Sequence, residues 1–234
     1  MRRLYGSIPH LPGSRAASDK TITAAQAQRC LDPAAARDGE EVIVQEKLDG
    51  SCVAILRDAT GKLEARGREG NLAAESRNDA RRMFSTWLAD NAARLSKVIG
   101  EEEVLVGEWL ALVHGTRYRL HHEPFVAFDL LKAGRVRVTV DELSERLAPA
   151  GVRMPAVVHR GAPCGTSAAC VLLGEHGRHG AIDPPEGLVY RVEHGGVDGG
   201  RRVALVAKWV RPDKVDGAYL PENTGREALY HWRP

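Results

Sequence analysis

The chain has 234 residues and a formal net charge of +2, with 43% hydrophobic and 27% charged residues. These values are typical of a globular protein and exclude a polybasic coat protein for nucleic acid. No apolar run approaches the roughly 18 residues of a membrane span, no signal peptide is recognisable, and the four cysteines show no zinc-type spacing, so we expect a cytoplasmic protein without a membrane partner.

The first third of the chain predicts a short helix followed by three strands. Residues 1–20 are rich in chain breakers, and a short helix is expected within residues 21–39, closed by Pro33 and Gly39. Apolar, β-branched runs bounded by turn residues then predict strands at 41–47, 51–58 and 62–67.

The longest predicted helix lies within residues 75–100 and ends at Gly100. Its apolar residues recur near helical spacing, which indicates one buried face. We interpret its basic residues as a solvent-exposed face: Arg77, Arg81 and Arg82.

The remaining chain predicts further strands interrupted irregularly by helices. Helices are expected at 141–149 and in "TSAACVLLGEHG", "GGVDGG" is expected to be a flexible loop, and residues 212–234 are expected to wrap the surface. This order favours an α+β fold of mainly antiparallel sheets with flanking helices. We expect one domain over 1–234, with residues 1–40 as an N-terminal extension packed on it. Strands are predicted at 103–113, 124–131, 135–140, 156–160, 186–194 and 201–211.

A single lysine stands out in the stretch "VIVQEKLDGSCVAIL". Lys47 lies between two apolar runs and is followed by Asp49 and Gly50. One interpretation is a hairpin whose turn happens to be charged. The other is lysine chemistry, because the cations of this chain are mostly arginines, which stay protonated and make poor nucleophiles.

Charged residues recur inside the predicted strands, where a buried unpaired charge is costly. Five strands carry one each, which predicts a shared polar cleft. Carboxylates beside a lysine suit a divalent metal and a phosphorylated substrate, and the nearby Phe128 fits either the core or stacking on a base. The five residues are Lys47, Glu108, Asp129, Glu186 and Lys208.

The order of short motifs resembles a known family. The segments "EKLDG", "ARG", "GEW", "FVAFD", "EGLVYR" and "VAKWVR" occur in the order of the nucleotidyltransferase motifs of covalent ligases. The sequence is similar to the ATP-dependent RNA ligases of the phage and RNA-editing type, from "PHLPGSR" to "KWVRP". This resemblance implies a nucleotidyltransferase (ATP-grasp-like) domain with a central nucleotide cleft.

The resemblance implies a catalytic role for three residues. Lys47 is expected to attack the α-phosphate of ATP and to carry AMP, with Asp49 completing the turn that presents it. This step needs a neutral amine, which we expect from a pKa lowered by nearby cations, a bound metal or partial desolvation. Lys208 is expected to contact the α-phosphate and to offset charge that develops there.

The resemblance also implies the nucleotide and metal sites, with ATP and Mg²⁺ or Mn²⁺ as cofactors. Glu186 is expected to hold the metal, with Asp129 as a further candidate. Glu108 is expected at the ribose, Phe128 at the adenine, and Arg66 at the nucleotide or the incoming 5′-phosphate, with Arg68 as its alternative. The complete expected nucleotide set is Glu46, Lys47, Arg66, Glu108, Phe128, Glu186 and Lys208.

Two positions depart from the family pattern. Val206 stands where the last motif usually has its first lysine, so phosphate contact is weaker, or Arg201, Arg202 or Arg211 supplies it, or Val206 is a plain core position. Ser51 and Cys52 stand near a position where some relatives carry asparagine, which puts metal-water contacts there in doubt.

The histidines and the N-terminal loop each have a structural and a functional interpretation. RNA-end binding is expected of His10, Ser14, Arg15, Arg68 and His114. The alternative for the N-terminal residues is a surface loop held by prolines, and the alternative for His114 is a packed histidine. His121 and His122 are expected to be solvated, and His176 and His179 to be free loop residues without zinc.

The expected activity is ATP-dependent joining of RNA with 5′-phosphate and 3′-hydroxyl ends through a lysyl-AMP intermediate, as in RNA repair. An end-processing kinase or phosphatase is a conceivable partner. No appended OB-fold is expected, because such a module would need roughly 100 residues after "KWVRP". The alternatives are a guanylyltransferase that uses GTP and a non-catalytic protein that binds nucleotides or RNA ends.

Overall fold

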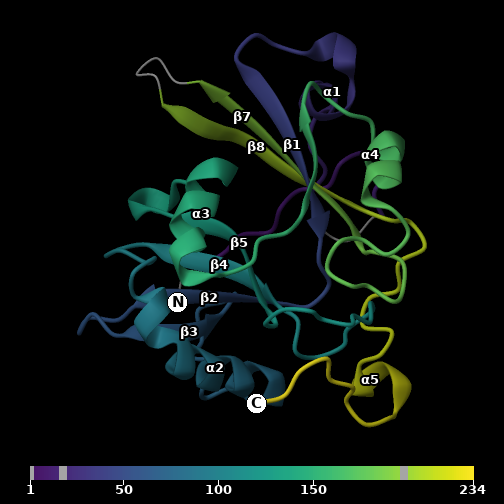
Figure 1. Ribbon diagram of the computed structural model, residues 1–234. Helices are drawn as coiled ribbons and strands as arrows, with labels where there is room; N and C mark the ends of the chain where they lie inside the picture. Colours follow the sequence, from purple (N-terminus) through teal and green to yellow (C-terminus); the bar gives the residue numbers. More distant parts are fainter. Residues whose placement is uncertain (1–2, 16–19, 196–199) are drawn as a thin grey trace.

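The computed structural model describes residues 3–15, 20–195 and 200–234. Two four-stranded sheets face each other, and helices cover their outer sides (Figure 1). Every pairing between neighbouring strands is antiparallel. The predicted α+β class of mainly antiparallel sheets is confirmed.

The first sheet has the order β6-β1-β7-β8. Alternate residues of β1, such as Val42 and Val44, enter an apolar core with Cys30 of α1 and Leu173 of α4. The other residues of β1 point to the opposite face of the first sheet, which is turned toward the second sheet. The strands are β1 (Glu40–Lys47), β6 (Val157–Gly161), β7 (Gly187–Gly195) and β8 (Arg201–Val210); the helices are α1 (Ala24–Leu31) and α4 (Thr166–Leu173).

The second sheet has the order β3-β2-β4-β5 and the larger core. Phe84 and Trp87 of α2 pack against Trp109 and Phe125 of the sheet. The indole N–H of buried Trp109 donates to the carbonyl of Ala80 at 2.7 Å, which fixes the helix on the sheet. The strands are β2 (Ser51–Arg57), β3 (Leu63–Gly67), β4 (Val104–Trp109) and β5 (Phe125–Leu131); the helices are α2 (Asp79–Leu95) and α3 (Val140–Leu147).

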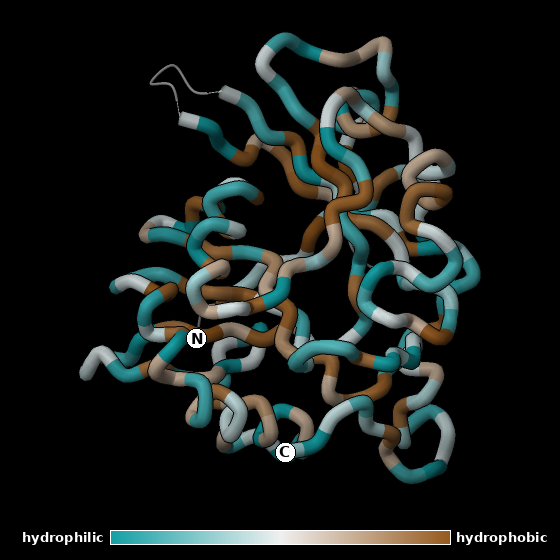
Figure 2. The backbone as a smooth tube through the Cα atoms, in the orientation of Figure 1, coloured by the Kyte–Doolittle hydropathy of each residue, from teal (hydrophilic) through white to brown (hydrophobic). Residues whose placement is uncertain are grey.

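Hydropathy follows these layers. The hydrophobic colours concentrate along the central strands, and the outer loops are mostly hydrophilic (Figure 2). No helix among the described residues is long and apolar enough to cross a membrane.

Both ends of the chain pack on the sheets. The N-terminal segment joins them, because Leu4 N–H donates to Arg68 next to β3 and Leu11 N–H donates to Lys208 of β8. The C-terminal segment contains the short helix α5 (Pro221–Thr224) and pairs with the chain after β4 through the Leu112–Tyr230 bridge. The remaining short helices are η1 (Pro33–Ala35), η2 (Ala133–Arg135) and η3 (Ala148–Ala150).

Three local predictions were wrong. The strand expected at 103–113 ends at Trp109, after which the chain pairs with the C-terminal segment. The strand expected at 135–140 is absent, because η2 precedes it and the hydroxyl of Thr139 caps α3. The charged-hairpin interpretation of "LDGS" also fails, since β1 and β2 belong to different sheets. Part of the "GGVDGG" loop, residues 196–199, lies outside the described residues.

Candidate active site

A cavity of about 130 Å³ lies between the two sheets. The first sheet contributes Lys47, Arg191 and Lys208 to its lining, and the second contributes Glu108 and Phe128. The N-terminal segment completes the wall with Tyr5, Gly6 and Ile8. The cavity thus combines cations, a carboxylate and an aromatic ring on facing strands.

Lys47 ends β1 and lies in the link between the sheets. Its Nζ donates to Glu186 Oε2 at 2.7 Å. The following turn is held against β4, because Gly50 N–H donates to Glu108 Oε1 at 3.0 Å. A Cβ at Gly50 would lie 2.6 Å from the Trp109 carbonyl oxygen, so this close approach requires glycine.

The resting amine of Lys47 is protonated. Burial opposes the charge, but the carboxylates of Glu186, Glu108 and Asp49 outweigh it and raise the pKa of Lys47 above its ordinary value. The prediction that this pKa is lowered is therefore wrong for the ligand-free protein.

Asp49 is held by a residue that the sequence did not single out. The ammonium group of Lys214 is fully buried and forms an ion pair with the Asp49 carboxylate. Gly115 N–H donates to the same Oδ2 at 2.8 Å, and Asp49 N–H donates to the Tyr118 hydroxyl at 3.0 Å. Lys214 lies in the breaker-rich tail, where no apolar pattern indicated burial.

Two glutamates border the cavity, of which Glu46 is buried and Glu108 is half-buried. Burial raises the pKa of Glu108 to about 8, with Lys47 opposing this shift and Glu186 and Asp49 adding to it. Burial also raises the pKa of Glu46 to about 7, partly offset by Arg178, whose N–H donates to Glu46 Oε2 at 2.8 Å. Oε1 of Glu46 has no hydrogen-bond partner among the described residues.

Phe128 reaches the cavity because of a β-bulge. Val106 pairs with Asp129 and the next residue of β4, Gly107, pairs with Ala127, so Phe128 is the extra residue of β5. Ala127 and Leu130 remain in the core of the second sheet. The bulge therefore exposes Phe128 to the cleft without breaking the strand.

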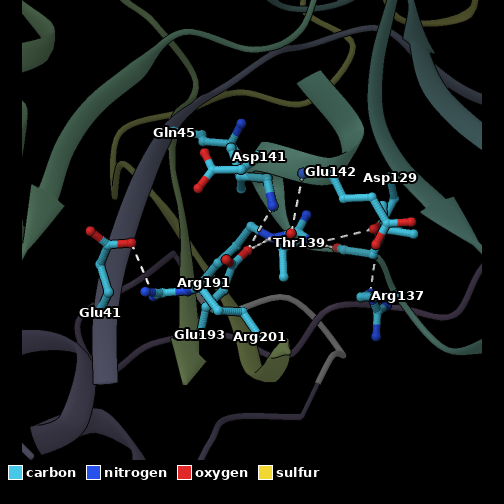
Figure 3. A network of polar contacts seen from close by, with 12 residues as sticks. Glu41, Gln45, Asp129, Arg137, Thr139, Asp141, Glu142, Arg191, Glu193 and Arg201 are labelled. Carbon is cyan, nitrogen blue, oxygen red and sulfur yellow. Dashed lines mark hydrogen bonds and ion pairs between the residues drawn. The ribbon is translucent and has the colours of Figure 1, made fainter. Parts of the chain in front are cut away.

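Asp129 does not line the cavity. Its buried carboxylate accepts from the Tyr5 hydroxyl at 2.9 Å, from Arg137 Nε at 2.7 Å and from Arg191 Nη2 at 3.2 Å. Figure 3 shows this network, in which Arg137 and Arg191 approach the carboxylate from different segments. Because its oxygens are committed to these partners, the prediction of Asp129 as a metal ligand is corrected to a structural ion pair.

Lys208 and Val206 both line the cavity from β8. Lys208 lies opposite Val189 in the sheet, and Val206 lies opposite Arg191. Val206 is a buried hydrophobic residue that also borders the cavity, so this face of the strand presents one lysine instead of two.

The expected replacements for the missing lysine lie elsewhere. Arg201 pairs with Glu41, Arg202 donates to His194, and Arg211 pairs with Asp213. None of the three lines the cavity.

The two arginines of "EARGRE" lie in different places. Arg68 lines the cavity and donates to the Tyr5 carbonyl at 3.1 Å. Arg66 does not, because its guanidinium is bound by Glu64 at 2.6 Å and by the Gly70 carbonyl at 2.7 Å. Of the two arginines, only Arg68 lines the cavity, and its role at the nucleotide or the 5′-phosphate stays a prediction.

The N-terminal residues expected at RNA ends hold the segment to β8. His10 Nδ1 and Ser14 Oγ lie 2.6 Å apart, and Ser14 Oγ accepts from Val210 N–H. Arg15 pairs with Asp216 at 2.7 Å. Their role at RNA ends stays a prediction.

His114 lies beside Ser51, at the beginning of β2. Its Nε2 is 3.3 Å from Ser51 Oγ, and burial lowers the pKa of its ring, with Asp49 opposing this shift. This position is compatible with the end-binding role expected of it.

His179 is not a free loop residue. It is buried, and its Nδ1 lies 2.9 Å from Nε2 of His122. The expectation that His179 is a free loop residue is therefore wrong. Burial lowers the pKa of His179 to about 4, and His122 adds to the shift.

The carboxylates fit a cation that arrives with phosphates better than a resident metal. No group of three or more His, Cys, Asp or Glu residues within the described parts of the chain is arranged to hold a metal ion. Mg²⁺ in nucleotide sites usually takes one or two carboxylates and completes its shell with phosphates and water. Glu186 pairs with Lys47, and its role as a metal ligand stays a prediction.

Two antiparallel sheets around a cleft that holds a lysine, carboxylates and an aromatic ring define the class of this protein as the nucleotidyltransferase fold. The family model described as RNA ligase matches residues 40–210, well over half of the chain. The chain therefore belongs to the RNA ligase family, as the motif order indicated.

Solved RNA ligase structures share the fold. An apo point mutant of the Naegleria gruberi RNA ligase matches with a TM-score of 0.53 at 17% identity, covering 95% of this chain and 62% of that chain. Another mutant of that ligase, with ATP and Mn, gives a TM-score of 0.51 at 17% identity, with coverages of 97% and 64%.

The chain spans less than two thirds of the length of these two solved proteins. No curated protein sequence matches it significantly.

Proposed function

We propose that this protein is an ATP-dependent RNA ligase that joins 5′-phosphate and 3′-hydroxyl ends through a lysyl-AMP intermediate. The observation that carries the proposal is the position of Lys47, which is held by Glu186 at the mouth of a cavity faced by Phe128 and Lys208. Residues 1–234 act in this proposal as one nucleotidyltransferase domain.

Three displacements at phosphorus make up the reaction. Lys47 Nζ attacks the α-phosphorus of ATP, and the bond to pyrophosphate breaks. The AMP group then passes to the oxygen of an RNA 5′-phosphate, which frees the lysine. Finally the 3′-hydroxyl attacks that phosphate, and AMP leaves as the new phosphodiester forms.

The residues of the chain act mainly by positioning and charge. Lys208 supplies fixed positive charge on the cavity wall. Phe128 offers a ring face for the base. Glu108 fixes the turn after Lys47 by accepting a hydrogen bond from Gly50 N–H. Mg²⁺ or Mn²⁺ bound with the triphosphate, with Glu186 as its protein ligand, would neutralise phosphate charge.

Competition at Glu186 explains how a protonated lysine becomes a nucleophile. While Glu186 is bound to Lys47, the amine keeps its proton. A cation held by Glu186 would weaken the largest attraction that raises the pKa of Lys47 and would thereby favour the neutral amine.

A sealing assay tests the proposal. A 5′-phosphorylated, 3′-hydroxyl RNA is incubated with the protein, ATP and Mg²⁺ or Mn²⁺, and compared with a 5′-hydroxyl RNA. We expect joined product only from the phosphorylated RNA and none with Lys47→Ala. Product formation without ATP by nucleotide-free protein, or full activity in Lys47→Ala, would contradict the mechanism.

A further inference from the structure

A second hollow lies outside the cavity, at the beginning of α2. Its volume is about 630 Å³, and it lies between the end of β3 and the first turn of α2. It is lined by Arg66, Gly67, Asn71, Leu72, Glu75, Ser76, Arg77, Asn78 and Arg81. We call this feature the α2 hollow.

The α2 hollow is basic, and two of its arginines are available. Three arginines face one carboxylate, Glu75. Arg66 is committed to Glu64. Within the described parts of the chain, neither Arg77 nor Arg81 forms an ion pair, and both are exposed.

The neighbouring Arg82 differs from these two. It pairs with Asp79 and donates to the Ser76 carbonyl at 2.7 Å, and it does not line the hollow. Arg82, which lies outside the hollow, thus has a carboxylate partner. Arg77 and Arg81, which line the hollow, form no ion pair among the described residues.

The α2 hollow adjoins the catalytic cleft. A Cβ at Gly67 would lie 3.9 Å from the guanidinium carbon of Arg81, and the next residue, Arg68, lines the cavity. Arg81 thus lies beside the end of β3, next to the residue that precedes Arg68.

Arginine, amide and hydroxyl groups together suit a phosphodiester. Guanidinium groups bind phosphate oxygens in paired geometry, and polar side chains add donors without reading base identity. We propose that the α2 hollow binds backbone phosphates of the RNA strand whose end lies in the cavity. This inference rests on the proposed function and extends it to a specific RNA path along β3 and α2.

The test compares two double variants that remove the same charge. Arg77→Ala/Arg81→Ala empties the hollow of its unpaired cations, whereas Arg82→Ala/Arg226→Ala removes two exposed arginines outside it. Affinity for a 5′-phosphorylated RNA is measured by fluorescence anisotropy over a series of salt concentrations. Self-adenylation and thermal unfolding are measured on the same preparations, so that a folding defect is visible.

We expect the hollow variant to bind RNA about tenfold more weakly at low salt, with a salt slope reduced by about 1 to 2, as expected for one or two lost phosphate contacts. The control variant should stay within about twofold of the unmodified protein. Equal RNA affinity and salt slope for both variants, in folded protein, would overturn the inference. So would weakened binding of pyrophosphate or ATP alone, with RNA affinity unchanged.

The two proposals fail in distinguishable ways. If the unmodified protein binds RNA through Arg77 and Arg81 but never forms an adenylate, the proposed ligase function fails and the α2 hollow stands. If adenylation and sealing occur and the hollow variant seals RNA with an unchanged KM, the hollow fails and the ligase function stands.

Discussion

At the residue scale, the main feature is a lysine surrounded by acids. Three carboxylates raise the pKa of Lys47, and Lys214 neutralises one of them, Asp49. These charges therefore favour the protonated form of Lys47 in the ligand-free protein.

The raised pKa of Lys47 predicts the pH dependence of adenylation. Below that pKa, each unit of pH increases the neutral fraction of the amine about tenfold. We therefore expect the second-order rate constant of self-adenylation, measured by quenched-flow labelling at subsaturating ATP, to rise from about pH 6 to 9, because it reports the protonation of the ligand-free protein. A flat profile, with folding unchanged by circular dichroism, would mean that the amine is already neutral before ATP binds.

Lys214 is predicted to position Asp49. Lys214→Met leaves the Asp49 carboxylate without its buried cation, and breaking such a pair costs about 3 kcal/mol of stability. Self-adenylation should fall at least about tenfold. Lys97→Met, at an exposed lysine without an ion pair among the described residues, is the matched control.

The double variant Lys214→Met/Asp49→Asn separates stability from activity. It removes both charges, so denaturant unfolding should show recovered stability while adenylation stays low. Full recovery of adenylation would show that Lys214 acts only through folding.

Glu46 makes a separate prediction about stability and pH. Burial raises its folded pKa from 4.5 to about 7, so the folded protein holds this proton more tightly than the unfolded chain. Stability from this group is complete below about pH 4.5 and is lost as pH rises to about 7, amounting to about 3 kcal/mol. Glu46→Gln should therefore unfold at higher urea than the unmodified protein at pH 8, and the difference should shrink at pH 5. A constant difference would contradict a titrating Glu46.

At the scale of elements, a bulge and a terminal segment shape the site. The bulge in β5 lets Phe128 face the cleft and Asp129 reach the N-terminal segment. The C-terminal segment holds the chain after β4, since His231 Nδ1 contacts the Leu110 carbonyl at 2.7 Å and Tyr118 N–H donates to His231 Nε2 at 2.9 Å. The Tyr118 hydroxyl in turn accepts from Asp49 N–H, which links this segment to the turn after Lys47.

Removal of residues 226–234 is predicted to loosen the site. The loss of Tyr230 and His231 exposes Leu112 and frees Tyr118, so we expect a lower melting temperature and at least about tenfold slower adenylation. Removal of Arg233 and Pro234 alone is the control, because it keeps both contacts. Unchanged adenylation in the longer truncation would show that Asp49 is held without this segment.

At the scale of the whole molecule, the sequence predicted the class and most elements. The strand periods and breakers located β1, β2, β3 and the helix α2 within a few residues, because local pattern decides them. The charged strand residues correctly indicated a cleft, since Lys47, Glu108 and Lys208 line it. Family motifs supplied the order of these residues along the chain.

The remaining features depend on tertiary contacts that no local pattern carries. Asp129 looked equivalent to the cleft residues, but its partners come from Tyr5, Arg137 and Arg191, far apart in the sequence. Lys214 lay in a breaker-rich tail with no sign of burial. The sequence indicates only a solvent-exposed face for Arg77, Arg81 and Arg82, because spacing along the chain does not show which arginines lack a carboxylate partner.

The most direct test of the central claim is transfer of label from α-³²P-ATP to the protein. The unmodified protein, Lys47→Ala and Lys97→Ala are incubated with labelled ATP or GTP and Mg²⁺ or Mn²⁺, then run on a denaturing gel. The account predicts an acid-labile label from ATP on the unmodified protein and Lys97→Ala, and none on Lys47→Ala. Label that persists in Lys47→Ala, label from GTP alone, or no label on folded protein would contradict it.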